Sequence, residues 1–518
     1  MKVSELKMDI NADNRSADEA SINQLAKGAS ISFAGRFIGR GLQVLSQIFL
    51  ARLLGPTQYG MYAIGWTLLR SGSVLAPLGL NYGVIRFAIQ YWPENLRKFT
   101  AVLRKSFLLT FLSGCIFGAT FFLGSPWLAT KFFKNVELIP ILRWFAISLP
   151  LATILRWGAS TTQITKRMGY SVFAEDFSQP LSNLILIVIF YFLGWGVIGA
   201  ASASFFSFIV ALIVVLIFLY KLFPTSFTID LQGVSQSSKQ LILFSLPTAL
   251  TGFFTVALPW MDRLFIGYYR PETEVGIYQA LSQTSILFAI IVNSFNAIFS
   301  PMIAELFHKQ QSSQLEELFR ISTKWGIYVS VPAFLIVCFA PQELLTFLFG
   351  KVYSVGYLSL IILTIAQMIN VATGAVSFLL IMTERQNLWL AISGSTLLIN
   401  LVLNYFLIPK FGQVGAAIAT AMSVTILFSL GLFQVKMKLN LWPYDRRYVK
   451  GIAAGLITVI LLIFVKKLQL NSPLLYLMWT IIVSVAVFPV LLVTFGLDIE
   501  DRQFITLIKH RIIKAIAK

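Results

Sequence analysis

Five polar residues recur at helical spacing near the start of the chain. Ser32, Arg36, Arg40, Gln43 and Gln47 are separated by four, four, three and four positions, which places them on one face of a helix. A guanidinium group binds phosphate oxygens in a bidentate way, and amide side chains suit sugar hydroxyls. The stripe therefore predicts a helix face that binds an anionic ligand rich in oxygen.

Further arginines interrupt the apolar runs that follow. Arg40 and Arg70 fall near the middle of their runs. A charge at that depth costs at least about 2.5–3.5 kcal/mol on insertion scales and usually faces an interior cavity. Arg143 and Arg156 bracket the fourth run. Together with Arg36, they either bind the same ligand or extend their charged ends to the membrane interface.

Other ionisable residues are candidates for a gate or for ion coupling. Asp262 and Arg263 end the seventh run and form either an interfacial pair or a gate, with Arg263 also a candidate for substrate binding. Glu175 lies near one end of the fifth run, and Glu305 follows the eighth. Each is either a proton site or an ordinary rim charge. The pattern leaves open whether H⁺ or Na⁺ is coupled, and it predicts no cofactor.

The chain offers little for enzymatic chemistry. It has two histidines, so a His-based metal site is not expected, and it has no GxxxxGK[ST] motif for using ATP. The only cysteines, Cys115 and Cys338, lie in apolar runs, which excludes a disulfide framework. No pair of carboxylates on a large outer loop suggests acid–base catalysis. These observations favour a transporter over an enzyme.

Apolar runs must position the polar residues. The 518 residues are 57% hydrophobic and only 12% charged, with a mean hydropathy of +0.78. Runs of about 20 apolar residues cross a bilayer as helices. We predict an all-α, polytopic membrane protein with fourteen spans, at 29–51, 59–82, 104–124, 138–158, 172–193, 196–219, 241–262, 275–300, 321–340, 355–382, 388–408, 412–435, 447–465 and 473–496.

Charge predicts the orientation of these spans. The side that holds the N-terminus carries 27 Lys and Arg residues and the opposite side 9. Basic loops stay in the cytoplasm, so both termini should be cytoplasmic. The net charge of +19 then reflects topology, and nucleic-acid binding is not expected. Residues 1–28 resemble a disordered cytoplasmic tail. Residues 499–518 form either an amphipathic helix on the inner leaflet or a frayed basic tail.

An internal repeat organises the spans. Gly60-Met61-Tyr62 matches Gly276-Ile277-Tyr278, and Val197–Ala201 matches Gln413–Ala417, both at an offset of 216. Further matches, including Arg52 with Arg263, lie at offsets of 211 to 218. The offset contains six spans, so the two copies are parallel, and such transporters place their substrate between two lobes. We expect an N-lobe over 29–222, a C-lobe over 239–436 and a separate helix pair over 447–496.

The two lobes differ in charge. Between residues 241 and 435 the expected spans contain no Lys or Arg in their interior. They carry uncharged stripes instead, such as Ser393, Thr396, Asn400 and Asn404, which either bind ligand or join helices to one another. A cavity between the lobes would be cationic on one wall and neutral on the other, which suits an amphiphilic anion.

Several segments resemble a known family. AGRFIGRGLQVLSQIFLARLLGPTQYGMYAIGWTLL resembles the opening of the bacterial polysaccharide flippases of O-antigen type, in the multidrug/oligosaccharidyl-lipid/polysaccharide (MOP) superfamily. LGLNYGVIRF (78–87), LLTFLFGKVYSVGYLSLIIL (344–363) and GQVGAAIATAMS (412–423) are similar to the family at the expected places. The six, six and two arrangement of spans also matches.

The resemblance implies a flippase in the bacterial inner membrane for cell-surface polysaccharide such as the O-antigen of lipopolysaccharide. Its substrate would be a polyprenyl-diphosphate-linked oligosaccharide, and its partners membrane lipids, a polysaccharide polymerase and glycosyltransferases. Arg40 and Arg70 fall near the cavity arginines of relatives that flip lipid II. Two alternatives stay open. They are an ion-coupled multidrug exporter of the same superfamily and a membrane-embedded glycan polymerase or ligase.

Overall fold

The structure is a computed structural model, and it describes residues 2–165, 167–224, 238–468, 472–498 and 500–502. The structure does not describe the side chains of residues 2–34, 36, 238–240, 244, 251, 255, 256, 258, 259, 291–298, 300 and 301. The chain divides into two compact units, Met1–Ala257 and Leu258–Lys518. The division falls inside one long helix, and each unit is described by itself.

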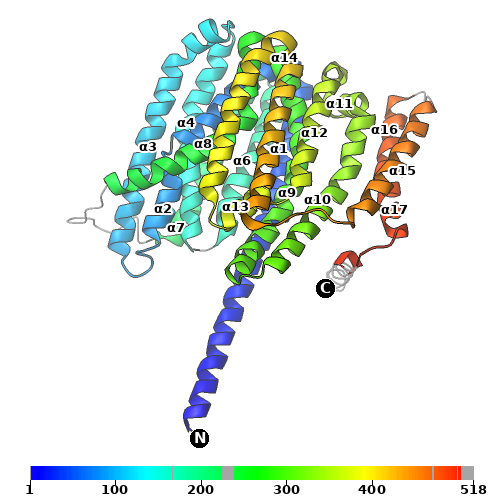
Figure 1. Cartoon of the computed structure of the whole chain (residues 1–518). Coiled ribbons are helices and arrows are strands. Elements are labelled where there is room, and N and C mark those ends of the chain that lie inside the picture. The colour runs from blue at the N-terminus through cyan, green and yellow to red at the C-terminus, as the bar shows by residue number, and fades with distance from the viewer. Residues whose placement is uncertain (1, 166, 225–237, 469–471, 499, 503–518) are drawn as a thin grey trace. The chain divides into compact units, whose positions relative to one another are not determined.

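The first unit is built of helices only, among its described residues (Figure 1). It contains the α-helices, the π-helices η1 and η3 and the 3₁₀ turn η2, in the order α1 (Lys2–Leu75), α2 (Leu80–Ala88), α3 (Leu96–Trp127), η1 (Leu128–Phe132), α4 (Leu138–Thr162), η2 (Gln163–Thr165), α5 (Met168–Val172), η3 (Phe173–Ser178), α6 (Gln179–Phe192), α7 (Gly196–Leu222) and the first part of α8 (Ser238–Tyr269).

The second unit is equally helical where it is described. After the end of α8 it contains α9 (Glu272–His308), α10 (Ser312–Phe339), α11 (Pro341–Phe349), the 3₁₀ segment η5 (Lys351–Gly356), α12 (Tyr357–Thr373), α13 (Val376–Met382), α14 (Gln386–Leu439), α15 (Tyr448–Lys467), α16 (Pro473–Ile482), the π-helix η6 (Val483–Val487) and α17 (Phe488–Thr494).

Two of the longest helices are pairs of helices that meet at a glycine. In α1 the kink lies at Gly55, whose φ of 69° belongs to the left-handed region that favours glycine, and Pro56 follows it. In α14 the kink lies at Gly412, with a φ of 55°. The expected spans 29–51 and 59–82, and 388–408 and 412–435, therefore fall on the two sides of these glycines.

The prediction of a polytopic helical membrane protein is confirmed. In the described part of the chain, ten helical stretches are long and apolar enough to cross a membrane, and two of them are the kinked pairs. The remaining expected spans, 241–262 and 275–300, fall in α8 and α9, which include residues whose side chains are not described. The exact count of fourteen stays a prediction.

The ends of the chain agree less well with expectation. Residues 1–28 were expected to be a disordered tail, but α1 begins at Lys2 (Figure 1). The segment contains four Ala and three Lys residues, which favour helix, and it continues directly into the first span. The predicted helix at 499–518 lies outside the described residues except for 500–502, and the membrane side of both ends stays a prediction.

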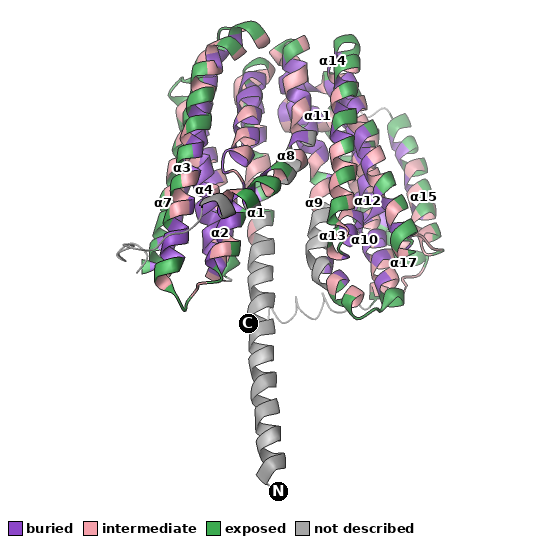
Figure 2. Ribbon diagram, turned by 60° about the vertical axis from the view of Figure 1, so that its left-hand side comes forward, coloured by how far each residue is buried: buried purple, intermediate pink, exposed green. Residues whose placement is uncertain are grey.

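The outward faces of the helices are apolar. The most hydrophobic window of α3 is only 17% buried, whereas that of α4 is 61% buried. Figure 2 shows exposed residues along the flank of α3 and buried ones on α4. Leu123 and Phe192 are 78% and 81% exposed. An apolar surface of this extent is stable in lipid but not in water, which agrees with a membrane protein.

In the first unit α4 is the central helix. It packs against α1, α3 and α7, and a Cβ at Gly65 of α1 would lie 2.3 Å from the Phe145 ring of α4. Such close approach of backbones through small residues is typical of helix packing in membranes. In the second unit α12 has the corresponding position and packs against α9, α10 and α14.

Buried tyrosines mark the internal repeat. In the first unit, the Tyr62 and Ser204 hydroxyl oxygens lie 3.1 Å apart, and Ser204 donates to Asn183 at 3.5 Å. In the second unit, Tyr278 and Thr420 both donate to Asp262. Tyr62 and Tyr278 are 216 positions apart, as are Ser204 and Thr420. The repeated scaffold is therefore present inside both units, and the second copy adds a carboxylate.

A charged cluster joins the C-terminal helices to α10. The Lys324 side chain is 1% exposed, and its Nζ lies 3.1, 2.9 and 2.9 Å from oxygens of Asp498, Glu500 and Asp501. Lys450 of α15 also binds Asp498, at 2.7 Å. We call these residues the C-terminal clamp. Lys324 was overlooked in the sequence because it stands at the start of its expected span, where a lysine normally reaches water.

Candidate functional site

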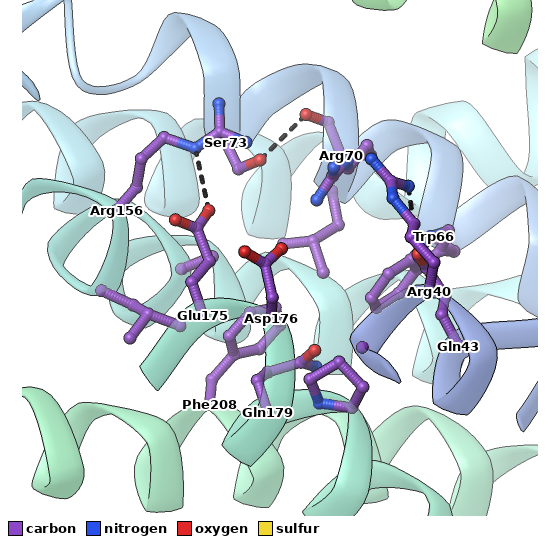
Figure 3. Close-up of a pocket in the computed structure, with 15 residues that line it drawn as sticks. Arg40, Gln43, Trp66, Arg70, Ser73, Arg156, Glu175, Asp176, Gln179 and Phe208 are labelled. Atoms are coloured by element: carbon purple, nitrogen blue, oxygen red, sulfur yellow. Dashed lines mark hydrogen bonds and ion pairs between the residues drawn. The ribbon is translucent and has the colours of Figure 1, made fainter. Parts of the chain in front are cut away.

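A pocket inside the first unit gathers five charged side chains. Arg40 and Arg70 come from α1, Arg156 from α4, and Glu175 and Asp176 from η3 (Figure 3). The pocket contains about 710 Å³ of space outside its atoms, which includes its open mouth. We call it the arginine pocket. Its described lining carries one more positive than negative charge.

The kink of α1 explains why Arg40 and Arg70 can share one pocket. They are thirty residues apart and lie on opposite sides of Gly55. A straight helix rises 1.5 Å per residue, so it would separate them by about 45 Å. Two helices that meet at a left-handed glycine can instead bring both side chains to one place.

The two carboxylates belong to a π-helix. Adjacent residues of a helix point in different directions, and both can still line one pocket, as Leu155 and Arg156 of α4 do here. Glu175 and Asp176 of η3 likewise both face the pocket (Figure 3). π-Helical bulges are frequent at functional sites.

Gly39 sets how closely η3 approaches α1. A Cβ at Gly39 would lie 1.9 Å from the backbone carbonyl oxygen of Asp176, so only glycine fits there. Arg40 is the next residue along α1. The absence of a side chain at Gly39 therefore determines the spacing between the arginines of α1 and the carboxylates of η3.

One ion pair in the pocket, between Arg156 and Glu175, is long. Arg156 Nε lies 3.8 Å from Glu175 Oε1, and the two side chains are 20% and 38% exposed. Arg40 is exposed, and its Nη1 donates to Gln43 Oε1 at 3.3 Å. The guanidinium of Arg70 lies within electrostatic reach of Arg40, Arg156 and both carboxylates. Each guanidinium has five N–H donors, so capacity is left for an oxygen-rich anion.

Uncharged residues complete the lining. Gln43, Ser73 and Gln179 supply polar groups, and Gln179 Nε2 donates to Ser207 at 3.1 Å. Trp66 and Phe208 form an aromatic wall, with ring centroids 6.5 Å apart and planes 15° from parallel. The arrangement offers cations, hydrogen-bonding groups and an apolar surface side by side.

Of the residues predicted from the sequence, Arg40, Arg70, Gln43, Arg156 and Glu175 are brought together in the arginine pocket. The side chain of Arg36 lies outside the described residues. Gln47 is 3% exposed and accepts a hydrogen bond from Tyr59 Oη at 2.7 Å. Arg143 is exposed and lies elsewhere, with its guanidinium 5.0 Å from the centroid of the Phe122 ring.

Asp262 and Arg263 lie in a buried polar cluster of the second unit. Arg263 is 0% exposed, donates to Gln279 and Ser282, and stacks 4.5 Å from the Trp260 ring. Asp262 is 1% exposed and accepts from Tyr278 at 2.5 Å, from Asn404 at 2.8 Å and from Thr420. Predicting an interfacial pair from position alone missed this burial.

Glu305 is a surface charge near the end of α9. Its Oε1 lies 2.5 Å from Lys309 Nζ, and both side chains are about 60% exposed. This geometry agrees with the rim-charge interpretation. No group of three or more His, Cys, Asp or Glu side chains that could hold a metal occurs among the described residues.

Sequence reasoning missed several lining residues, of which Asp176 is the most consequential. A 3.6-residue period assigns it to a different face from Glu175, and nothing in the sequence marks η3 as a π-helix. Trp66, Ser73 and Phe208 were also missed, because aromatic and hydroxyl residues in apolar spans are usually packing residues.

Comparison with known proteins supports a common fold. A family model described as polysaccharide biosynthesis protein matches residues 49–357. The probable low-salt glycan biosynthesis flippase Agl15 of Haloferax volcanii is 24% identical over 415 residues, covering 78% of this chain and 81% of that protein.

Two solved structures have the same fold. The lipid II flippase MurJ, in an inward closed conformation, has a TM-score of 0.66 at 14% identity and covers 89% of this chain and 98% of its own. An inward-facing multidrug resistance MATE family transporter of the MOP superfamily has a TM-score of 0.65 at 18% identity, with 80% and 98% covered. The predicted MOP-type fold is confirmed.

Proposed function

Since the chain belongs to the family of polysaccharide biosynthesis proteins, we propose that it is a flippase for a polyprenyl-diphosphate-linked oligosaccharide. It would move this lipid from the cytoplasmic to the outer leaflet of the bacterial inner membrane. The observation that carries the proposal is the arginine pocket. Placing three guanidinium groups within a membrane-embedded unit is costly, and guanidinium groups suit the oxygens of a diphosphate.

Different pocket residues contact different parts of the substrate. Arg40, Arg70 and Arg156 bind the diphosphate oxygens, because charge-assisted hydrogen bonds to guanidinium are the strongest available here. Gln43 and Gln179 bind sugar hydroxyls. Trp66 and Phe208 contact the apolar faces of the first sugar or of the prenyl chain. Transport follows by alternating access of the two parallel repeats.

We place ion coupling at Asp262, with H⁺ or Na⁺ as the ion. A carboxylate that is 1% exposed and surrounded by hydroxyl and amide groups has the chemistry for either ion. Asp262→Asn would then remove the dependence of transport on the ion gradient. The test is initial flipping rate with and without an imposed gradient of each ion. A gradient effect that persists unchanged in the variant contradicts this part of the proposal.

The finer parts of the proposal concern cellular context. Both termini are cytoplasmic by the distribution of Lys and Arg. The polysaccharide is a surface glycan, with the O-antigen of lipopolysaccharide as the representative case. Glycosyltransferases would supply the substrate at the inner leaflet, and a polymerase would consume it at the outer leaflet.

A multidrug exporter is the second candidate, and the similarity to the MATE transporter favours it. That function needs a cavity that holds organic cations. The arginine pocket has three cations against two carboxylates among its described side chains, so it repels such substrates. We therefore rank the exporter below the flippase.

Reconstitution separates the two functions. Purified protein in liposomes is supplied with a fluorescent polyprenyl-diphosphate sugar in the inner leaflet. We expect protein-dependent exposure of the fluorophore to a quencher outside. Liposomes without protein are the control. No exposure of the lipid, together with uptake of a cationic dye under an ion gradient, would contradict the flippase and establish the exporter.

A further inference from the structure

The arginine pocket contains its own anions. Figure 3 shows the Glu175 carboxylate directed at Arg156, and the Asp176 carboxylate directed into the space beside Arg70. A carboxylate and a phosphate present the same kind of oxygen to a guanidinium group. Glu175 and Asp176 therefore occupy part of the binding capacity that a diphosphate would use.

The pairing is weak enough to be exchanged. The distance of 3.8 Å from Arg156 Nε to Glu175 Oε1 is longer than a charge-assisted hydrogen bond of about 2.7–2.9 Å. The Glu175 side chain is 38% exposed, so water solvates it when it leaves the arginine. A fully buried pair would resist displacement much more strongly.

The position of the carboxylates is built into the backbone. Glu175 and Asp176 of the π-helix η3 both line the pocket, and the absence of a Cβ at Gly39 lets the Asp176 backbone approach α1 closely. The local structure thus places both carboxylates beside the arginines of α1 and α4.

A transporter has a reason for such carboxylates. A site must bind its substrate well enough to load it and weakly enough to release it. Three arginines without counter-ions would hold a diphosphate tightly and would be costly to keep in an empty, membrane-embedded pocket. Carboxylates that return to the arginines lower the cost of the empty state and favour release.

We propose that Glu175 and Asp176 are displaceable counter-ions, which pair with Arg156 and Arg70 when the pocket is empty and which a diphosphate group replaces on binding. Their negative charge competes with the diphosphate for the arginines, so they lower its affinity and favour its release. This inference rests on the proposed function, since it assumes a diphosphate-bearing substrate, but it can be tested without transport.

The test uses the full-length protein in nanodiscs and inorganic pyrophosphate as the probe, with binding measured by calorimetry. Glu175→Gln and Asp176→Asn each remove a competing charge and retain shape, so each should tighten pyrophosphate binding by about five- to tenfold. Glu305→Gln is the matched control, because this exposed glutamate lies outside the pocket and pairs with Lys309. It should leave pyrophosphate binding unchanged.

A second variant separates competition from a change in folding. In the Arg156→Gln background, Glu175→Gln should tighten binding by less than twofold, because its partner is gone. Thermal unfolding of every variant monitors the fold. The counter-ion proposal is overturned if Glu175→Gln and Asp176→Asn bind pyrophosphate as weakly as the wild type or more weakly, or if no form binds it at millimolar concentration.

The outcome is distinguishable from that of the flippase test. Tighter pyrophosphate binding in both variants with no lipid movement in liposomes would support the counter-ion proposal and contradict the flippase proposal. Lipid movement with unchanged pyrophosphate affinity in the variants would support the flippase proposal and contradict the counter-ion proposal. In the liposome assay, both variants should also slow turnover at saturating lipid, because release becomes harder.

Discussion

Arg156 and Arg263 are arginines in membrane-embedded helices with a carboxylate nearby, yet their surroundings differ. Arg156 is 20% exposed, lines a pocket and has one carboxylate at 3.8 Å. Arg263 is fully buried, donates to Gln279 and Ser282 and lies against two aromatic rings. An arginine whose donors are engaged by its own protein stabilises the fold, whereas one with spare donors over a pocket can bind a ligand.

The comparison predicts the largest loss of stability at Arg263. Arg263→Met would leave Gln279 and Ser282 without their donor and the buried charge of Asp262 without a nearby cation. Breaking a buried charged network in this way costs about 3–5 kcal/mol. We expect much lower yield of folded protein and a clear drop in its thermal unfolding temperature in detergent.

Arg52 provides the control for Arg263, because it is the residue matched to it in the repeat and its side chain is exposed. Arg52→Met should change stability by less than about 0.5 kcal/mol. If Arg263→Met is as stable as the wild type but inactive in transport, Arg263 is a gate residue and the comparison fails.

A second buried cation tests the same principle in the C-terminal clamp. Lys324→Met would remove the cation that three partly buried carboxylates share. We expect the free energy of unfolding to fall by about 3 kcal/mol, the lower end of the range for a broken buried charge network. Limited proteolysis should then cut residues 495–502 faster than in the wild type. Lys309→Met is the control, since Lys309 is 59% exposed. Equal proteolysis of both variants would contradict a stabilising role for Lys324.

Acid should weaken the clamp as well. Burial opposes ionisation, but Lys450 and Lys324 outweigh it and lower the pKa of Asp498, and Lys324 likewise lowers the pKa of Glu500. A carboxylate with a lowered pKa stabilises the fold fully above its unfolded value, and the stabilisation is lost as pH falls through the folded value.

Wild-type thermal stability should therefore decline as pH falls below about 4, the unfolded range of carboxylates. Lys324→Met should show a flatter decline, because its carboxylates lose one of the cations that lower their pKa. Parallel curves for the two proteins between pH 5 and pH 3 would show that the clamp does not stabilise the fold.

A smaller structural effect is expected at Gly39, and it links packing to binding. Gly39→Ala inserts a methyl group 1.9 Å from the Asp176 carbonyl oxygen and must displace η3, at about 1–3 kcal/mol. Gly41→Ala meets nothing within 4 Å and should be neutral or slightly stabilising. Pyrophosphate affinity should change in the first variant only. Equal pyrophosphate affinities of the two variants would show that the close approach of η3 to α1 does not affect binding.

The sequence predicted the fold class and four of the five charged side chains of the pocket, for reasons that differ in strength. Apolar runs fix the membrane helices because no other structure satisfies the backbone in lipid. Arg40, Arg70 and Arg156 could be identified because a charge inside an apolar run is costly and therefore informative. Asp176 could not, because a 3.6-residue period assigns it to a different face from Glu175.

The buried cations were harder to predict. Arg263 and Lys324 stand near the ends of expected spans, where the sequence suggests contact with water. In the structure, Trp260 of the same helix and polar residues of the next helix, Gln279 and Ser282, surround Arg263. Carboxylates 174 to 177 residues away bury Lys324. Such contacts arise from tertiary structure, so depth within a single span does not reveal them.

The central claim is that the arginine pocket holds the diphosphate of a transported lipid. Its most direct test compares Arg70→Gln with Arg143→Gln in the liposome leaflet assay. Arg70→Gln should fold normally and lower the flipping rate at subsaturating lipid at least about tenfold, the effect of one lost charge-assisted hydrogen bond. Arg143→Gln, outside the pocket, should flip like the wild type. Normal flipping by Arg70→Gln, or equal loss in both variants, would contradict the account.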